Sequence, residues 1–252
     1  MTADAGAWLA AARRDASEAA RAADVAIVPA TTPDELDVLR RTMESIWGPE
    51  IVPPRNLLRG MALSGNCLLV AWRSGSPVGF ALGWLGWDGG VHFHSHQVGV
   101  QADGRGAGIG YALKLAQRAL CLEHGVTEMR WTYDPLLMSN ARFNLGRLGA
   151  VVMSFIPHCY GDRRDAFNTG DTTDRVEVSW RLDALVGGSF VEPASGDTVV
   201  RIPVHYHELR TSDPEAALAV RREVGAVLAD AFATGRSVRG MCEHGYVLWS
   251  TQ

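Results

Sequence analysis

The stretch that most constrains this chain runs from Val98 to Leu113 and reads VGVQADGRGAGIGYAL. An apolar run ends in a loop with glycines at positions 104, 106, 108 and 110, and a helical pattern follows directly. Glycines let the backbone approach a ligand closely and present its N–H groups. The dipole of the following helix would face the same place. The stretch therefore predicts a strand, loop and helix arranged to bind a pyrophosphate.

Three nucleotide-binding patterns compete for these glycines. A P-loop needs Lys followed by Ser or Thr, and Lys114 lies too far into the helix. A dinucleotide fingerprint would need a third glycine where Ile109 stands. The spacing from Arg105 to Gly110 resembles instead the acyl-CoA loop of the GNAT N-acyltransferases, whose pattern is [RQ]xxGx[GA]. A glycine-rich turn without a ligand remains the alternative.

Length and composition set the outer limits. A chain of 252 residues can form one large domain or one domain with an appendage. Its 47% hydrophobic and 21% charged residues are ordinary for a soluble globular protein. A net charge of −4 gives no reason to expect nucleic acid or an anionic membrane as partner, and no segment has the length of a membrane helix. Four cysteines without a CxxC pair predict reduced thiols and a cytoplasmic location.

Apolar periodicity and turn signals predict the order β-α-α-β-β-β-(glycine loop)-α-β-α-β, preceded by an alanine-rich helix. The second helix has a capping box, with Thr32 as cap and Glu35 three residues later. The expected helices cover residues 5–22, 33–47, 55–64, 108–124 and 140–148, and the expected strands cover 25–30, 66–73, 77–84, 91–100, 126–133, 150–157 and 176–182.

This order resembles the GNAT core from Val25 to about Trp180, which implies an α/β (α+β) fold. The resemblance implies a mixed sheet whose central strands, 91–100 and 126–133, are parallel neighbours that splay apart to admit pantetheine, with helices on its faces. A further sign is an Asn that opens the short helix after the second of these strands. The residues that the resemblance assigns to acyl-CoA binding are Val98, Gly99, Val100, Arg105, Gly106, Ala107, Gly108, Ile109, Gly110 and Asn140.

The chain divides in sequence into three parts. Residues 1–24 form an N-terminal helix that docks on the domain or on a partner subunit, and residues 25–183 form the GNAT-like acyl-CoA-binding core. Residues 184–252 form a linker and an extension that docks on the core. The extension reads as strand, helix and strand, a small βαβ tail that resembles an uncharacterised GNAT branch. A homodimer remains open.

The strand segment VHFHSHQV places His92, His94 and His96 on one face if side chains alternate. Three imidazoles suggest zinc, but ligands at i, i+2 and i+4 span about 13 Å at ~3.3 Å per residue. All three cannot reach one ion at about 2 Å. Two could, with a third ligand from elsewhere, but we expect no metal.

A general base is the better interpretation of these histidines. His94 stands six residues before Val100, where several enzymes that this chain resembles place an acidic base. A neutral imidazole, with a pKa near 6.5, can take a proton from an ammonium substrate. His96 is the second candidate, and histidines that merely pack on a sheet are the alternative. Where many GNAT enzymes have a Tyr as general acid this chain has Leu145, so Tyr160 or Tyr133 would have to replace it.

Acceptor recognition is expected from Trp84, His92, Arg163 and Arg175, the last two in or beside the polar loop 160–174. Arginine pairs well with carboxylates, so an amino-acid-like amine is favoured. The sequence therefore predicts an acetyl-CoA-dependent (or other acyl-CoA-dependent) N-acyltransferase that acylates a primary amine of a small molecule by direct transfer in a ternary complex. The alternatives are an N-succinyltransferase, a protein N-acetyltransferase and a non-catalytic CoA-binding sensor.

Overall fold

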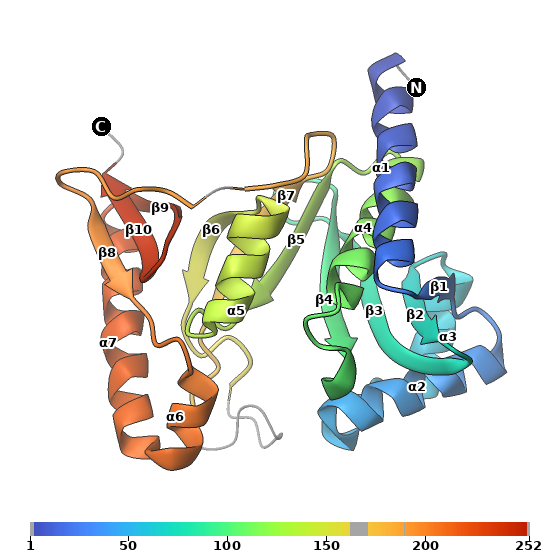
Figure 1. Cartoon of the computed structure of the whole chain (residues 1–252), viewed down its shortest axis with the longest axis horizontal. Coiled ribbons are helices and arrows are strands. Elements are labelled where there is room, and N and C mark those ends of the chain that lie inside the picture. The colour runs from blue at the N-terminus through green and yellow to red at the C-terminus, as the bar shows by residue number, and fades with distance from the viewer. Residues whose placement is uncertain (1–2, 162–170, 189, 251–252) are drawn as a thin grey trace. The chain divides into compact units, whose positions relative to one another are not determined.

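The computed structural model describes residues 3–161, 171–188 and 190–250, and these fall into two compact units (Figure 1). Among the described residues, the first unit holds 3–129 and 181–184, and the second holds the rest. Both units combine helices and strands, which confirms the predicted α/β class. No helix within the described ranges is long and apolar enough to cross a membrane.

The first unit contains the elements up to the end of the glycine-loop helix. They are α1 (Ala3–Ala22), β1 (Ala26–Pro29), α2 (Pro33–Trp47), η1 (Pro49–Ile51), α3 (Arg55–Leu63), β2 (Cys67–Arg73), β3 (Ser76–Gly86), β4 (His92–Val100), η2 (Ala102–Gly104) and α4 (Ile109–Glu123). The predicted capping box at the start of α2 is present, because Glu35 accepts from the Thr32 N–H at 2.8 Å while Thr32 Oγ1 accepts from the Glu35 N–H at 3.4 Å.

Strands β1 to β4 form an antiparallel array in chain order, whose side chains alternate between two helical layers. Leu68, Val70, Phe80 and Leu82 point to one side and form a buried cluster with residues of α2 and α3. The residues between them face α4, since a Cβ at Gly79 would lie 3.3 Å from Ile109. The sheet is thus covered on both faces, which explains its continuous apolar runs.

Helix α1 lies beside α4, so the N-terminal helix docks on its own domain (Figure 1). The contact centres on Arg118 of α4, whose side chain is 1% exposed. Its guanidinium donates to Asp15 of α1 at 2.8 Å and to the carbonyls of Leu182 and Ala184, each at 2.9 Å. Because a buried cation needs its hydrogen-bond acceptors, the bond from Arg118 to Asp15 fixes the position of α1 against α4.

The second unit begins within β5. Its elements are β5 (Glu128–Tyr133), α5 (Met138–Ala141), the π-helical η3 (Arg142–Leu148), β6 (Val151–Ile156), β7 (Arg175–Arg181), β8 (Thr198–Arg201), α6 (Tyr206–Ser212), α7 (Pro214–Ala233), β9 (Arg236–Cys242) and β10 (Gly245–Ser250). Strand β7 lies between β5 and β6 and pairs antiparallel with β6. The splay predicted between β4 and β5 concerns strands of different units and stays a prediction.

The C-terminal extension is richer than the predicted strand, helix and strand. Three strands form a separate sheet in the order β8-β10-β9, with both pairings antiparallel, so the tail is not a parallel βαβ unit. The sequence did not reveal β9, because RSVRGMC alternates poorly and contains Gly240, and it did not reveal the short helix α6, which follows β8 after a turn. The division of the sequence at 24 and 183 stays a prediction.

Candidate active site

The glycine loop folds as the sequence predicts, between the end of β4 and the start of α4. Gly106 and Gly108 have φ values of +82° and +84°, a region that other residues rarely adopt. The first helical hydrogen bond runs from the Ala112 N–H to the Gly108 carbonyl at 3.0 Å. The N–H groups of Ile109 and Gly110 therefore have no acceptor within the helix and point out of its N-terminus.

The space around the loop suits an anion. A Cβ at Gly106 would meet nothing within 4 Å, and one at Gly108 only the Cβ of Ala23 at 3.8 Å. Arg105 is exposed, and within the described ranges it makes no ion pair. Free N–H groups, a helix dipole and one cation beside open space are the features that hold a phosphate. The residues present therefore fit the pyrophosphate of an acyl-CoA.

Strand β4 carries a bulge at His96 that the expected alternation misses. Gln97 pairs with Leu82 while Ser95 pairs with Gly83, so His96 is an extra residue. The face of the strand changes there: a Cβ at Gly99 would meet Phe80, whereas Ser95 points to α4. The expected alternation therefore breaks at His96, while His94 and His96 stay on the side of Trp84.

Three predicted site residues form one aromatic cluster at the bulge. The indole of Trp84 has its centroid 5.3 Å from the His94 ring and 4.6 Å from the His96 ring, and the two imidazoles are 5.8 Å apart. All three side chains are half-buried, so they are ordered and still reach solvent. His92 lies apart: it is buried, and its Nδ1 is 3.0 Å from the Gly90 carbonyl.

A buried polar chain lies behind the two histidines, and sequence reasoning missed it. The Lys114 Nζ donates to the Ser95 hydroxyl at 2.8 Å, and that hydroxyl donates to Gln117 Oε1 at 2.8 Å. Burial holds the pKa of the Lys114 amine well below its usual range, and burial raises the pKa of the neighbouring Cys67 thiol to about 12. Because Ser95 stands between His94 and His96, these buried hydrogen bonds hold the bulge in place. A polar run inside an apolar helix (Lys114, Gln117, Arg118) was its only signal.

In the second unit Tyr160 is the better placed of the two candidate acids. Its side chain is 38% exposed, and its hydroxyl lies 2.9 Å from the Thr132 hydroxyl. The Arg175 guanidinium lies 5.5 Å from the centre of its ring. Tyr133 is buried, and burial raises the pKa of its phenol above the ordinary range. A proton donor must reach its acceptor, which favours Tyr160 over Tyr133.

The remaining predicted residues are placed as follows. Val98 and Val100 are half-buried opposite Ala81 and Gly79, and Asn140 is half-buried in α5. Leu145 is 7% exposed, so a buried apolar side chain stands where the resemblance implies a Tyr. Arg163 lies outside the described residues. The glycine loop, Trp84, His94 and His96 belong to the first unit, whereas Asn140, Tyr160 and Arg175 belong to the second.

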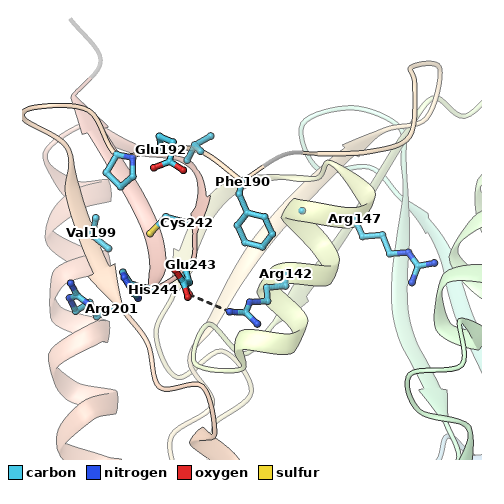
Figure 2. Close-up of a pocket in the computed structure, with 12 residues that line it drawn as sticks. Arg142, Arg147, Phe190, Glu192, Val199, Arg201, Cys242, Glu243 and His244 are labelled. Atoms are coloured by element: carbon cyan, nitrogen blue, oxygen red, sulfur yellow. Dashed lines mark hydrogen bonds between the residues drawn. The ribbon is translucent and has the colours of Figure 1, made fainter.

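A cavity of about 960 Å³ lies in the second unit, between η3 and the three-stranded sheet (Figure 2). Arg142 reaches across to the Glu243 carbonyl at 3.3 Å, while Arg147 points away from the other side chains drawn. The lining combines three arginines (Arg142, Arg147 and Arg201) with two carboxylates (Glu192 and Glu243). None of the predicted site residues lines it.

No group of three or more His, Cys, Asp or Glu side chains that could hold a metal occurs in the described part of the chain. Of the β4 histidines, His94 and His96 contact Trp84, whereas the His92 Nδ1 lies 3.0 Å from the Gly90 carbonyl.

Comparison with known proteins gives one family and many similar folds. Residues 36–143 match the model of the acetyltransferase (GNAT) family. Comparison with curated protein sequences finds no match. Similar solved structures include Ard1 from Thermoplasma volcanium, with 18% identity, coverage of 63% of this chain and 97% of that one, and a TM-score of 0.49. The ribosomal-protein-S18-alanine N-acetyltransferase from Escherichia coli has 13% identity, coverage of 67% and 99%, and a TM-score of 0.49.

A mosquito arylalkylamine N-acetyltransferase-like protein has 14% identity, coverage of 62% and 99%, and a TM-score of 0.48. These structures are too distant to indicate a substrate. The family model is more specific, because the residues it matches include the glycine loop, both clustered histidines and Asn140. Residues 36–143 of the chain are therefore similar to the GNAT family of acetyltransferases.

Proposed function

We propose that this protein transfers an acetyl group from acetyl-CoA to the primary amine of a small, amino-acid-like molecule, directly and within a ternary complex. The observation that carries the proposal is the loop of Gly106 and Gly108, whose left-handed backbone turns at the N-terminus of α4. Four reduced cysteines fit a reducing compartment such as the cytoplasm.

The cosubstrate would be held by backbone rather than by side chains. The N–H groups of Gly106, Gly108, Ile109 and Gly110 would bind the pyrophosphate, with Arg105 adding a charge. The β4 segment 98–100 and Asn140 would bind the pantetheine arm, as the family resemblance implies. When bound, acyl-CoA supplies the thioester from which the acyl group is transferred.

His94 acts as general base, with His96 as the second candidate. The amine attacks the thioester carbonyl only when neutral, so the base removes one proton from the ammonium, directly or through water. The indole of Trp84 fixes both imidazoles, since its ring is in contact with each. As the new C–N bond forms and the C–S bond breaks, Tyr160 gives its phenolic proton to the departing sulfur. The second proton of the amine nitrogen leaves as the amide forms and restores the phenol, and the proton held by the base passes to water.

The acceptor would be bound by Trp84, Arg163 and Arg175, as the sequence predicts. Trp84 offers an apolar surface, and the guanidinium of Arg175, with Arg163, would pair with a carboxylate on the acceptor. This pairing is the reason for favouring an amino-acid-like amine. A longer acyl donor such as succinyl-CoA, and a protein amine as acceptor, remain variants of the same chemistry.

A non-catalytic CoA-binding sensor is the second candidate. The observation that favours it is Leu145, which is buried and leaves no hydroxyl at the position where the family usually has a Tyr. The two candidates share the CoA site and differ only in turnover.

Calorimetric titration with acetyl-CoA, succinyl-CoA and CoA tests the proposal, followed by a CoA-release assay over a panel of free amines and peptides. We compare Gly108→Asp with Gly108→Asn, because Asn tolerates φ > 0 and lacks the charge. Gly125→Asp is the matched control, since Gly125 ends the same helix with φ +73° and open space around it.

We expect micromolar binding that Gly108→Asp abolishes, that Gly108→Asn weakens less, and that Gly125→Asp leaves intact. Amine-dependent release of CoA then establishes the transferase. Binding without turnover over the whole panel favours the sensor. Absence of binding to all three compounds overturns both.

A further inference from the structure

Helix α7 of the C-terminal extension carries a buried cation that joins two distant segments. The side chain of Arg221 is 2% exposed. It donates to Asp134 at 2.8 and 2.7 Å and to Asp171 at 3.0 and 2.7 Å. Asp134 directly follows β5, whereas Asp171 precedes β7. One guanidinium therefore binds two carboxylates that come from separate segments of the second unit.

The surroundings of this clamp (Arg221, Asp134 and Asp171) satisfy its charges. The Tyr206 hydroxyl donates to Asp171 at 2.9 Å, and the Leu136 N–H donates to Asp134 at 2.9 Å. Arg210 lies 3.8 Å from Asp171, so two cations face two anions. Hydrogen bonds and charge from Arg221 outweigh burial and hold the pKa of the Asp171 carboxyl below its usual range. Only the planar fork of an arginine can donate to two carboxylates in this way.

The two clamped segments are also the ones that hold Tyr160. Thr132, whose hydroxyl lies 2.9 Å from the Tyr160 hydroxyl, stands two residues before Asp134. Thr173, whose hydroxyl accepts from the Tyr160 N–H at 3.0 Å, stands two residues after Asp171. One segment thus fixes the phenol and the other fixes the backbone of the same residue.

We propose that Arg221 is a positioning residue for Tyr160, and that the C-terminal extension therefore contributes to catalysis through Arg221. This inference rests on the acid role proposed for Tyr160. Arg221 does not touch the substrate: it sets the distance between segment 132–134 and segment 171–173, and so the direction of the phenol.

The test compares Arg221→Lys and Asp171→Asn with Leu228→Ala. Lys keeps the charge of Arg221 but cannot serve two carboxylates, and Asp171→Asn covers the case in which Arg221→Lys fails to fold. Leu228 lies in the same helix, is fully buried and has an apolar side chain, so its truncation destabilises α7 without touching the clamp.

Two readouts separate positioning from stability. The first is the rate at which iodoacetamide alkylates Cys159, which precedes Tyr160 and is half-buried, whereas the other three cysteines are buried. The second is kcat and the amine KM, measured alone and in combination with Tyr160→Phe.

We expect Arg221→Lys to raise the Cys159 alkylation rate about tenfold and to lower kcat by a similar factor while KM changes less. The loss of kcat should vanish in the Tyr160→Phe background, because two changes that act through one group are not additive. Leu228→Ala should lower Tm and leave both readouts near wild type.

An unchanged Cys159 rate in a folded Arg221→Lys overturns the clamp. Faster alkylation in Arg221→Lys, together with a wild-type kcat in the single variant Tyr160→Phe, would refute the acid role of Tyr160 and, with it, this inference. The proposed CoA site would be unaffected by that result. If Leu228→Ala changed the Cys159 alkylation rate and kcat equally, Arg221 would act only through the stability of α7.

Discussion

The indole of Trp84 lies against the imidazole of His96, with ring centroids 4.6 Å apart and planes inclined by 40°. His96 is the extra residue of the β4 bulge, whereas His94 pairs with Trp84 in regular register. Two imidazoles of β4, one in regular register and one at the bulge, therefore pack on a single indole. Such a cluster can place one histidine to move a proton and the other to orient it.

Replacing the two histidines one at a time should identify the base. We expect His94→Ala to lower kcat/KM about 100-fold and to remove the acid limb of its pH profile, since positioned general bases contribute at least this much. His96→Ala should lower the rate less and keep the limb. Steady-state kinetics against pH with one amine acceptor measures both, and the reverse order would assign the base to His96. An unaltered profile in both variants would exclude either role.

The docking of α1 offers a paired test of buried and exposed ion pairs. Asp15→Ala leaves the buried Arg118 guanidinium short of one acceptor, and it should cost about 1 to 2 kcal/mol of unfolding free energy, less than a fully buried pair because Asp15 is partly exposed. Glu123→Ala removes the Arg13 contact between the same two helices, where both side chains are about half exposed, and should cost under ~0.5 kcal/mol. Urea unfolding of the two variants measures the contrast, and equal losses would refute it.

The chain's local signals predict its regular elements well. The turn between the expected strands 66–73 and 77–84, the glycine loop and the Thr32 cap each act through backbone conformation or hydrogen bonds a few residues apart, and each occurs where the sequence places it. The α4 face of Ile109, Ala112 and Leu113 is buried as its spacing predicts. Such features depend on residues close in sequence, which is why sequence can predict them.

The candidate site is predicted only in part, since its geometry depends on distant pairings. The bulge at His96 arises from register against β3, and no local pattern in VHFHSHQV reveals it. The Arg221 clamp joins α7 to segments 87 and 50 residues away. Strand β9 forms because it pairs with β10, although its own sequence favours a strand only weakly.

Lys114 should reduce stability in the neutral range. Its amine is buried with a lowered pKa, so the unfolded chain binds more protons and the unfolding free energy rises with pH above the folded pKa. Lys114→Met keeps the shape and should raise stability at pH 6, with a smaller gain at pH 8, by at most about 1.4 kcal/mol per pH unit for one proton. Chemical denaturation between pH 6 and 8 measures this, a range below the ordinary pKa of 9.0 for the buried thiols. A constant difference across that range would contradict a buried neutral amine.

The capping box should stabilise α2 through the charge of Glu35. Hydrogen bonds from the Thr32 and Thr31 N–H groups lower the pKa of this carboxyl to about 2 from 4.5. A lowered folded pKa gives stability that is complete above pH 4.5 and lost as pH falls toward 2. Glu35→Gln keeps an oxygen acceptor without the titration. The wild type should therefore have the higher Tm at pH 7, and the two proteins should converge near pH 2. Thermal unfolding across this range measures the gap, and a gap that stays constant would show that the carboxylate contributes nothing beyond its oxygen.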